Sequence, residues 1–217
     1  LIALLSVATA RPQTDSARTT VYVDTVLGNF SIELLDDVSP NTVANFLNYV
    51  RDGDYDGTFF HRALPGFVLQ GGGFSFGTDG VLSEVPSDPP VANEFRLSNI
   101  RGTIAMAKLG GNPNSATNQW FINLADNSAN LDAQNGGFTV FARVIGDGMD
   151  VIDAIVAQPI SNFGGTFTDL PTINYSSGTV QREHLVNINS MSVIESTLTS
   201  TGIATPASVP TGTSVLF

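Results

Sequence analysis

The interpretation of this chain depends most on residues 60–73, whose sequence is FHRALPGFVLQGGG. The stretch sets one cation, Arg62, among aromatic and amide side chains and ends in three glycines. This combination is typical of a peptide-binding surface rather than of a core strand, where charged side chains are rare. Two later segments extend the pattern. Residues 118–123 (NQWFIN) place amides beside aromatics, and residues 137–144 (GFTVFARV) indicate another strand.

The composition favours one domain rich in β-structure. The chain has 217 residues, enough to bury a full core, and it shows neither an internal repeat nor a change of composition in its middle. Its 21 glycines and 14 phenylalanines suit a turn-rich β-architecture. A helical bundle would use more Ala, Leu, Glu and Lys.

Charge and cysteine content exclude several functions. The formal net charge is -11 and Lys108 is the only lysine, so no basic face is available for phosphates and nucleic acid is not an expected partner. The absence of cysteine removes disulfides and thiolate chemistry, and with two histidines no zinc set is expected. Residues 52–57 (DGDYDG) copy only the start of a calcium loop, because Ala63 stands where a bidentate glutamate is required. We therefore expect neither metal nor cofactor.

The two ends of the chain differ from its middle. Residues 1–7 are apolar and precede the small-residue sequence ATA, a pattern found before signal-peptide cleavage sites. Residues 1–18 are therefore interpreted as a signal-peptide remnant and linker, which predicts an extracytoplasmic protein, periplasmic or secreted. A ragged N-terminus without a targeting role is the alternative. Residues 196–217 are rich in Ser and Thr and are expected to form a flexible tail, which leaves residues 19–195 as the folded domain.

Hydrophobic periodicity predicts a hairpin, two helices and a last strand. Apolar residues alternate through residues 21–34 around a turn at Gly28-Asn29. Apolar residues at i, i+3, i+4 and i+7 predict a helix that is capped by Ser39 and ends at Gly53. A second helix is expected over residues 149–157. A strand is expected over residues 185–194, and the region between the helices contains short β-type runs and loops long enough to build a site.

In their order and spacing, the three segments that begin with Phe60, Asn118 and Gly137 resemble the cyclophilin family of peptidyl-prolyl cis/trans isomerases, in a form closer to its bacterial members. The resemblance runs from about Val21 to Ile194. It implies a mainly β fold, a closed eight-stranded antiparallel β-barrel capped by two α-helices. It also implies an enzyme that accelerates rotation about X-Pro bonds in proline-containing polypeptides, and we expect a monomer without cofactors.

The chemistry of amide rotation explains why such a site needs a cation beside an apolar pocket. Twisting the X-Pro amide breaks its resonance, at a cost of about 18–20 kcal/mol, and restores a lone pair on the proline nitrogen. A donor aimed at that nitrogen binds the transition state selectively. Arg62 is the candidate because a guanidinium stays charged and offers a fixed set of donors.

The resemblance assigns further residues to this site. Phe67, Val68, Phe121 and Leu131 would line the proline pocket, and Gln70 would hold the substrate backbone and Arg62. The catalytic residues are accordingly expected to be Arg62, Gln70, Phe67 and Phe121, and the substrate-binding residues Phe60, Val68, Ala107, Lys108, Gln119, Asn130, Leu131 and Phe138.

Further expectations concern His61, which is the neighbour of Arg62, and two positions that differ from many eukaryotic members. His61 should point away from Arg62, because side chains alternate along a strand, and so should have a structural role. Asn130 stands where many eukaryotic members have Trp, and Phe138 where they have His, which puts cyclosporin binding in doubt.

The leading hypothesis is a prolyl isomerase that assists the folding of exported proteins. The alternative is a proline-peptide binding or holdase module with little turnover, which could dispense with Arg62.

Overall fold

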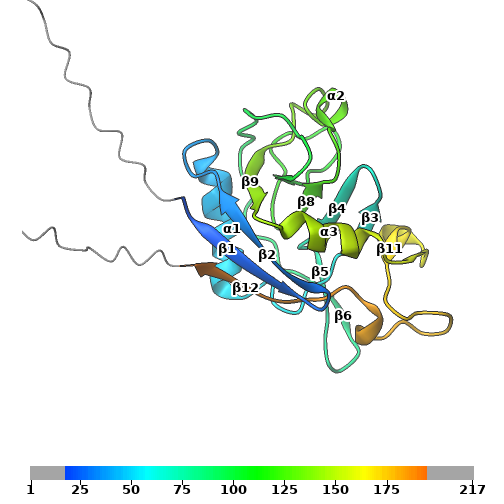
Figure 1. Cartoon of the computed structure of the whole chain (residues 1–217). Helices are drawn as coiled ribbons and strands as arrows, with labels where there is room; N and C mark the ends of the chain where they lie inside the picture. The colour runs from blue at the N-terminus through cyan, green and yellow to red at the C-terminus, as the bar shows by residue number, and fades with distance from the viewer. Residues whose placement is uncertain (1–17, 195–217) are drawn as a thin grey trace, which may run out of the picture.

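The computed structural model describes residues 18–194, so the predicted N-terminal segment, apart from residue 18, and the predicted tail lie outside the described residues. The main sheet is antiparallel and has the strand order β12-β1-β2-β9-β7-β8-β4-β3 (Figure 1). Its strands are β1 (Thr20–Thr25), β2 (Gly28–Leu34), β3 (Arg62–Leu64), β4 (Val68–Gly71), β7 (Thr103–Met106), β8 (Trp120–Asn123), β9 (Val140–Ile145) and β12 (Ile188–Ile194).

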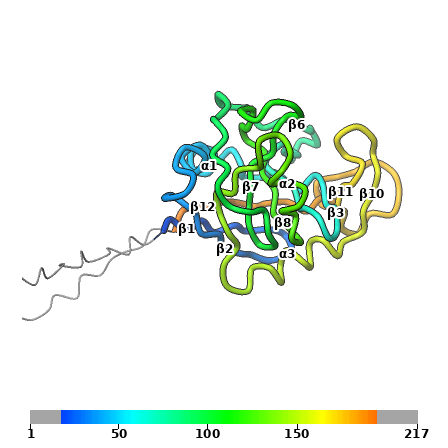
Figure 2. Tube along the Cα trace, turned by 90° about the horizontal axis from the view of Figure 1, so that it is seen from above, coloured from blue at the N-terminus to red at the C-terminus, as the bar shows by residue number. Residues whose placement is uncertain are grey.

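Smaller elements surround this sheet. Two strand pairs stand apart from it, and three α-helices and two 3-10 turns are present among the described residues; none of the helices is long and apolar enough to span a membrane. These elements are β5 (Phe74–Phe76) with β6 (Leu82–Glu84), β10 (Ile160–Ser161) with β11 (Leu170–Pro171), α1 (Pro40–Asp52), α2 (Ser128–Leu131), α3 (Gly148–Val156), and the 3-10 turns Gly165–Phe167 and Arg182–His184. The helices α1 and α3 lie on different sides of the strands (Figure 2).

The sheet is an open, curled half-barrel, and the prediction of a closed barrel is wrong. The strands β12 and β3 stand at the two ends of the strand order. The outer edge of β3 does not pair with β12. Instead, Ala63 N donates to the carbonyl oxygen of Asp169 at 2.8 Å. The segment before β3 meets the start of β12 through single contacts, such as Ile188 N to Thr58 O at 2.7 Å. The seam is therefore bridged by isolated hydrogen bonds and not by a ladder.

Both predicted helices are present. In α1, Pro40 occupies the first turn, and Gly53 ends the helix with a left-handed φ of 76°, a conformation that glycine adopts without strain. The Ser39 side chain does not cap the helix. Its Oγ donates to Val140 O at 3.2 Å and ties the helix start to β9. The third helix, α2, has only four residues and was not predicted, since so short a segment carries no periodicity.

Two strand boundaries differ from the prediction. The first hairpin turns at Val26 and Leu27, two residues earlier than expected, because Thr25 Oγ1 donates to Gly28 O at 2.6 Å and accepts from Leu27 N at 3.2 Å. The last strand starts at Ile188 instead of residue 185, because the preceding residues form isolated bridges to other segments.

The buried apolar residues divide into a main core and a smaller cluster that supports the site. The main core fills the curled sheet, and Trp120 lies edge-on to the rings of Phe46, Tyr55 and Phe60 within it. The smaller cluster consists of Leu35, Val68, Ala105, Phe121, Leu131 and Val140. It contains three of the residues predicted to line the proline pocket.

Candidate active site

Strand register places the key residues of the site in one row. Arg62 pairs with Gln70 across β3 and β4, and Gln70 pairs with Phe121 across β4 and β8. Phe121 in turn pairs with Ala105 of β7. Residues paired across antiparallel strands present their side chains on the same face. The cation, the amide and the aromatic ring are thus neighbours although they lie far apart in the sequence.

These side chains border a hollow of about 390 Å³, which we call the active pocket. Its floor is apolar and buried, and consists of Val68, Phe121 and Leu131. Ten of the twelve predicted site residues line it, together with Gln134, which was not predicted. They are Arg62, Phe67, Val68, Gln70, Ala107, Lys108, Phe121, Asn130, Leu131 and Phe138.

Polar contacts hold the arginine at the rim of the active pocket. Arg62 Nη1 donates to Gln70 Oε1 at 3.5 Å, and Gln70 Nε2 donates to Gln119 Oε1 at 2.9 Å. Arg62 Nε also lies 3.9 Å from Asp169 Oδ2, with side chains 35% and 32% exposed. An ion pair so open to solvent contributes little stability, so its main effect is on orientation. Sequence reasoning missed Asp169, since no motif marks it and only the pairing of its loop with β3 brings it here.

Gln119 lies in an adjoining hollow of about 420 Å³, which shares Gln70, Ala107 and Lys108 with the active pocket. The glycines after β4 make room for this arrangement. A Cβ on Gly72 would lie 2.7 Å from the carbonyl oxygen of Asn118, and a Cβ on Gly73 would lie 2.8 Å from the Gln119 side chain. Only glycine therefore allows the backbone to approach so closely.

Phe60 does not line the active pocket, and its assignment as a substrate-binding residue is wrong. The side chain is fully buried in the main core. Its ring lies edge-on to Trp120 at 5.7 Å and covers Gly71, where a Cβ would come within 3.2 Å of it. Phe60 precedes β3, and the chain at this point turns its side chain toward the core.

Lys108 fastens one wall of the active pocket. Its Nζ donates to the carbonyl oxygens of Asn135 at 2.8 Å and Gly137 at 2.7 Å, and lies 4.8 Å from the centre of the Phe138 ring. Burial lowers the pKa of Lys108. Phe138 in turn lies edge-on to Phe121 at 5.7 Å. The ammonium group is therefore committed to the loop that carries Phe138.

Asparagine side chains fix the position of Phe67. Asn127 Nδ2 donates to the carbonyl oxygen of Phe67 and to Asn123 Oδ1, both at 2.8 Å. Leu124 N donates to the same carbonyl at 2.8 Å. Sequence reasoning missed this support, for which the frequent asparagines of residues 118–127 are the available signal.

His61 lies outside the active pocket, as the alternation of side chains along the strand predicts. It is buried, and its ring lies edge-on to Phe74 at 5.0 Å. Neither ring nitrogen has a hydrogen-bond partner within residues 18–194. Burial, with a smaller contribution from the neighbouring Arg62 charge, lowers the pKa of His61 to about 4. A neutral, unpartnered imidazole in this position is part of the packing.

Comparison with solved structures defines the class of fold. The chain is similar to a cyclophilin-type peptidyl-prolyl cis-trans isomerase of Cryptosporidium parvum, with a TM-score of 0.61 and 22% identity over 82% of this chain and 98% of the other. A second structure of that protein, in the presence of the dipeptide Ala-Pro, gives a TM-score of 0.60 at 22% identity and covers 81% and 99% of the two chains. The fold is therefore cyclophilin-like.

Sequence comparison identifies the family. The family model "Cyclophilin type peptidyl-prolyl cis-trans isomerase/CLD" matches residues 20–175. A peptidyl-prolyl cis-trans isomerase of Acinetobacter baylyi is 44% identical over 68% of this chain and 77% of its own length. Isomerase A of Dickeya dadantii is 41% identical over 76% and 85%, and isomerase B of Escherichia coli is 45% identical over 59% and 78%. The chain belongs to the cyclophilin-type peptidyl-prolyl cis-trans isomerases, and its function is that of an isomerase enzyme.

Proposed function

We propose that this isomerase acts on proline-containing polypeptides by holding the proline ring on the apolar floor of the active pocket while Arg62 donates to the proline nitrogen. The observation that supports this assignment is the position of Arg62, at the rim of a pocket whose floor is Val68, Phe121 and Leu131. The nitrogen accepts a hydrogen bond in the twisted amide and not in the planar one. Arg62 therefore favours the transition state over either ground state.

The free energy of one hydrogen bond from Arg62 is smaller than the free energy that a large rate acceleration requires. A 10⁵-fold acceleration would correspond to roughly 7 kcal/mol, at about 1.36 kcal/mol per tenfold. One charge-assisted hydrogen bond contributes about 1.5–3 kcal/mol. The remainder is assigned to the apolar wall and floor, where exclusion of water favours the less polar, twisted amide over the planar one. Phe67, Phe121 and Phe138 are the largest side chains in that wall and floor.

The polar residues around Arg62 are proposed to divide two tasks. Gln70 orients the guanidinium through Oε1 and is itself oriented by Gln119. Gln119, with the backbone of Ala107 and Lys108, borders the adjoining hollow and would hold the substrate chain on one side of the proline. The substrate backbone is thereby fixed while the amide rotates.

We further propose that the protein is extracytoplasmic, that it assists the folding of exported proteins, and that it works as a monomer without metal or nucleic acid. The apolar residues 1–7 followed by ATA support export, and the net charge of -11 disfavours nucleic acid. Cell fractionation of the producing organism tests the location. Recovery of the protein in the cytoplasm alone would contradict it.

The activity is tested by NMR exchange measurements on a short X-Pro peptide. We expect the full chain to accelerate cis/trans exchange at substoichiometric concentration, and to accelerate the refolding of a protein limited by an X-Pro bond. Binding of the peptide without faster exchange would contradict the proposal and favour the holdase alternative.

A further inference from the structure

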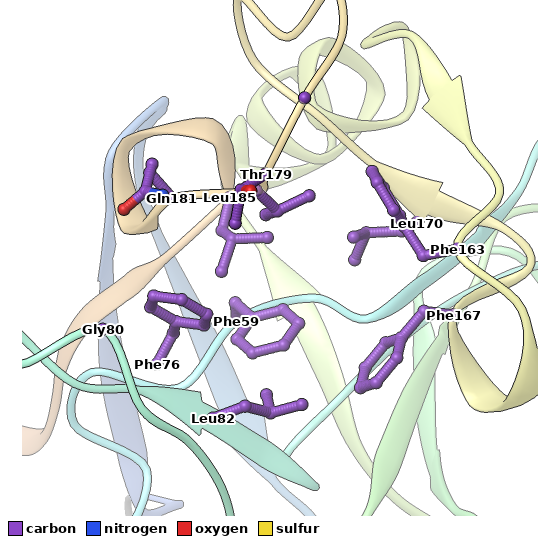
Figure 3. A pocket seen from close by; sticks show the side chains of 12 residues that line it. Phe59, Phe76, Gly80, Leu82, Phe163, Phe167, Leu170, Thr179, Gln181 and Leu185 are labelled. Atoms are coloured by element: carbon purple, nitrogen blue, oxygen red, sulfur yellow. The ribbon is translucent and has the colours of Figure 1, made fainter.

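A second apolar hollow, of about 400 Å³, lies outside the active pocket, and we call it the side pocket. The rings of Phe59, Phe76 and Phe167 surround it, and Leu82 closes it on the side of β6 (Figure 3). Phe59 and Leu170 are buried, whereas Leu82 and Phe163 are 45% and 39% exposed. The hollow is thus a preformed apolar cavity with apolar side chains at its mouth.

The side pocket is fixed in shape. The rings of Phe59 and Phe167 are 6.1 Å apart, and Phe74 lies edge-on to Phe167 at 5.0 Å. Arg182 Nη1 donates to the carbonyl oxygen of Phe76 at 2.6 Å and ties the β5–β6 hairpin to the 3-10 turn Arg182–His184. A preformed pocket loses little conformational entropy when it binds a ligand.

The strand that borders the side pocket is suited to a polypeptide. In the part of the chain that the structure describes, strand β6 pairs with β5 alone, in a sheet of two strands, and all three of its residues are exposed. An edge strand presents backbone donors and acceptors to which an extended peptide can add, while pockets beside the strand receive alternate side chains. The occupant that matches an apolar pocket beside an edge strand is therefore an extended chain that carries a large apolar side chain.

The same strand connects the side pocket to the substrate groove. Leu82, at one end of β6, lines the side pocket, and Glu84, at the other end, lines the adjoining hollow. That hollow shares Gln70, Ala107 and Lys108 with the active pocket. Residues two apart on a strand lie about 7 Å from one another and face the same way. The adjoining hollow therefore shares strand β6 with the side pocket and three lining residues with the active pocket.

We propose that the side pocket is a docking site for a large apolar side chain, Leu or Phe, of the polypeptide whose X-Pro bond occupies the active pocket. This inference rests on the isomerase activity proposed above and extends it to substrate choice. The enzyme would then act preferentially on unfolded chains, in which such side chains are exposed near prolines. Short X-Pro peptides would fill the active pocket and leave the side pocket empty.

Peptides of matched length test the proposal. All peptides share one X-Pro core with an extension on each side. The Leu-Phe peptide carries a Leu-Phe pair roughly three to six residues from the proline, and it is made in two versions, with the pair before or after the proline. The control peptide carries Ser-Ser at the same positions. We expect the full chain to show a KM and a Kd about tenfold lower for one of the Leu-Phe peptides, as burial of one large apolar side chain implies.

Variants at the side pocket are compared with control variants whose substituted side chains are similarly exposed to solvent. In Leu82→Ser/Phe163→Ser, the preference for the Leu-Phe peptide should disappear, while exchange on a four-residue X-Pro peptide stays at the parent rate because neither residue lines the active pocket. Val26→Ser and Ile100→Ser, at side chains 45% and 47% exposed that line neither pocket, should keep the preference. The single variant Leu82→Ser serves if the double variant does not fold.

The experiment distinguishes a failure of the proposed docking site from a failure of the isomerase activity. Equal Kd values for the Leu-Phe and Ser-Ser peptides in the parent, or a preference that survives in the pocket variants, would overturn the docking site. Loss of the preference in Val26→Ser would overturn it as well. Absence of exchange on the four-residue peptide would contradict the activity alone, because the Kd comparison needs no turnover.

Discussion

Gln70 lies directly opposite Arg62 in the β3–β4 ladder, and its Oε1 accepts a hydrogen bond from Arg62 Nη1 at 3.5 Å. The same amide donates through Nε2 to Gln119 at 2.9 Å, so both ends of the Gln70 side chain are occupied. The pairing is fixed by strand register and not by a flexible loop. The guanidinium is consequently oriented by Gln70 of the sheet as well as by Asp169 of the loop beside β3.

Removal of the Gln70 amide should lower activity without unfolding the protein. In Gln70→Leu, Arg62 loses its partner in the sheet and Gln119 is left without its donor, so we expect kcat/KM on a short X-Pro peptide to fall by about tenfold, or about 1.4 kcal/mol. Gln158→Leu is the matched control, since Gln158 follows α3 and its side chain bonds only to Ala154 O among the described residues. Equal kcat/KM in the parent and in Gln70→Leu would show that Arg62 needs no such support.

Loss of the Lys108 ammonium should loosen the wall that carries Phe138. Lys108→Met keeps the length of the side chain and removes the donors to the 135 and 137 carbonyls. We expect KM for a short X-Pro peptide to rise by about threefold to tenfold with a smaller change in kcat, because two partly buried carbonyl oxygens lose their charged donor, at a cost of about 1 kcal/mol. Lys108→Arg should recover part of the loss. A fall in kcat with KM unchanged would place Lys108 in the chemical step instead.

The buried His61 should make stability depend on pH. Its pKa is lowered to about 4 in the folded protein, against an ordinary value of 6.5, so the unfolded chain binds more protons between these values. Stability is therefore complete above about pH 6.5 and is lost as the pH falls toward 4. We expect the free energy of unfolding to fall by about 2 kcal/mol between pH 7.5 and 5 from this group.

Urea denaturation of the parent and of His61→Leu at both pH values measures this contribution. The variant should lose about 2 kcal/mol less than the parent over the same interval. Because the comparison uses the change with pH, it is independent of any packing defect that leucine introduces. Identical pH dependence in the two proteins would mean that folding does not lower the pKa of His61.

Asn130 at the rim of the active pocket should limit cyclosporin binding. The position borders the pocket beside Leu131 and Phe138. We expect the parent to bind cyclosporin weakly and Asn130→Trp to bind it more tightly, by about tenfold, since an indole adds a large apolar contact. Titration calorimetry on both proteins gives the comparison. Tight binding by the parent would remove Asn130 as the limiting position.

The family, the helices α1 and α3 and most residues of the active pocket could be predicted from the sequence, because these features depend on local patterns. Arg62, Phe67 and Gln70 fall within one short stretch, register places Arg62 opposite Gln70, and all three line the active pocket. The contact of Arg62 with Asp169 could not be predicted, since it depends on a loop pairing with the outer edge of β3.

Side-chain direction was the other feature that sequence could not supply. Phe60 was placed at the site by its neighbours in the stretch, but it points into the core, where Trp120 and Gly71 leave a space that fits its ring. Lys108 was expected to be a substrate-binding residue. Its side chain instead turns toward carbonyl oxygens from a loop distant in the sequence. Both outcomes depend on tertiary packing, which no local pattern reports.

The most direct test of the account is cis/trans exchange on a short X-Pro peptide, measured by NMR for the parent, Arg62→Ala and Arg143→Ala. Arg143 is the control because it lies on β9, pairs with Glu33 and carries the same charge away from the active pocket. We predict that Arg62→Ala lowers the exchange rate by at least about tenfold, a loss of roughly 1.4 kcal/mol, while Arg143→Ala keeps the parent rate. An unchanged rate in Arg62→Ala would contradict the role of Arg62 as the transition-state donor.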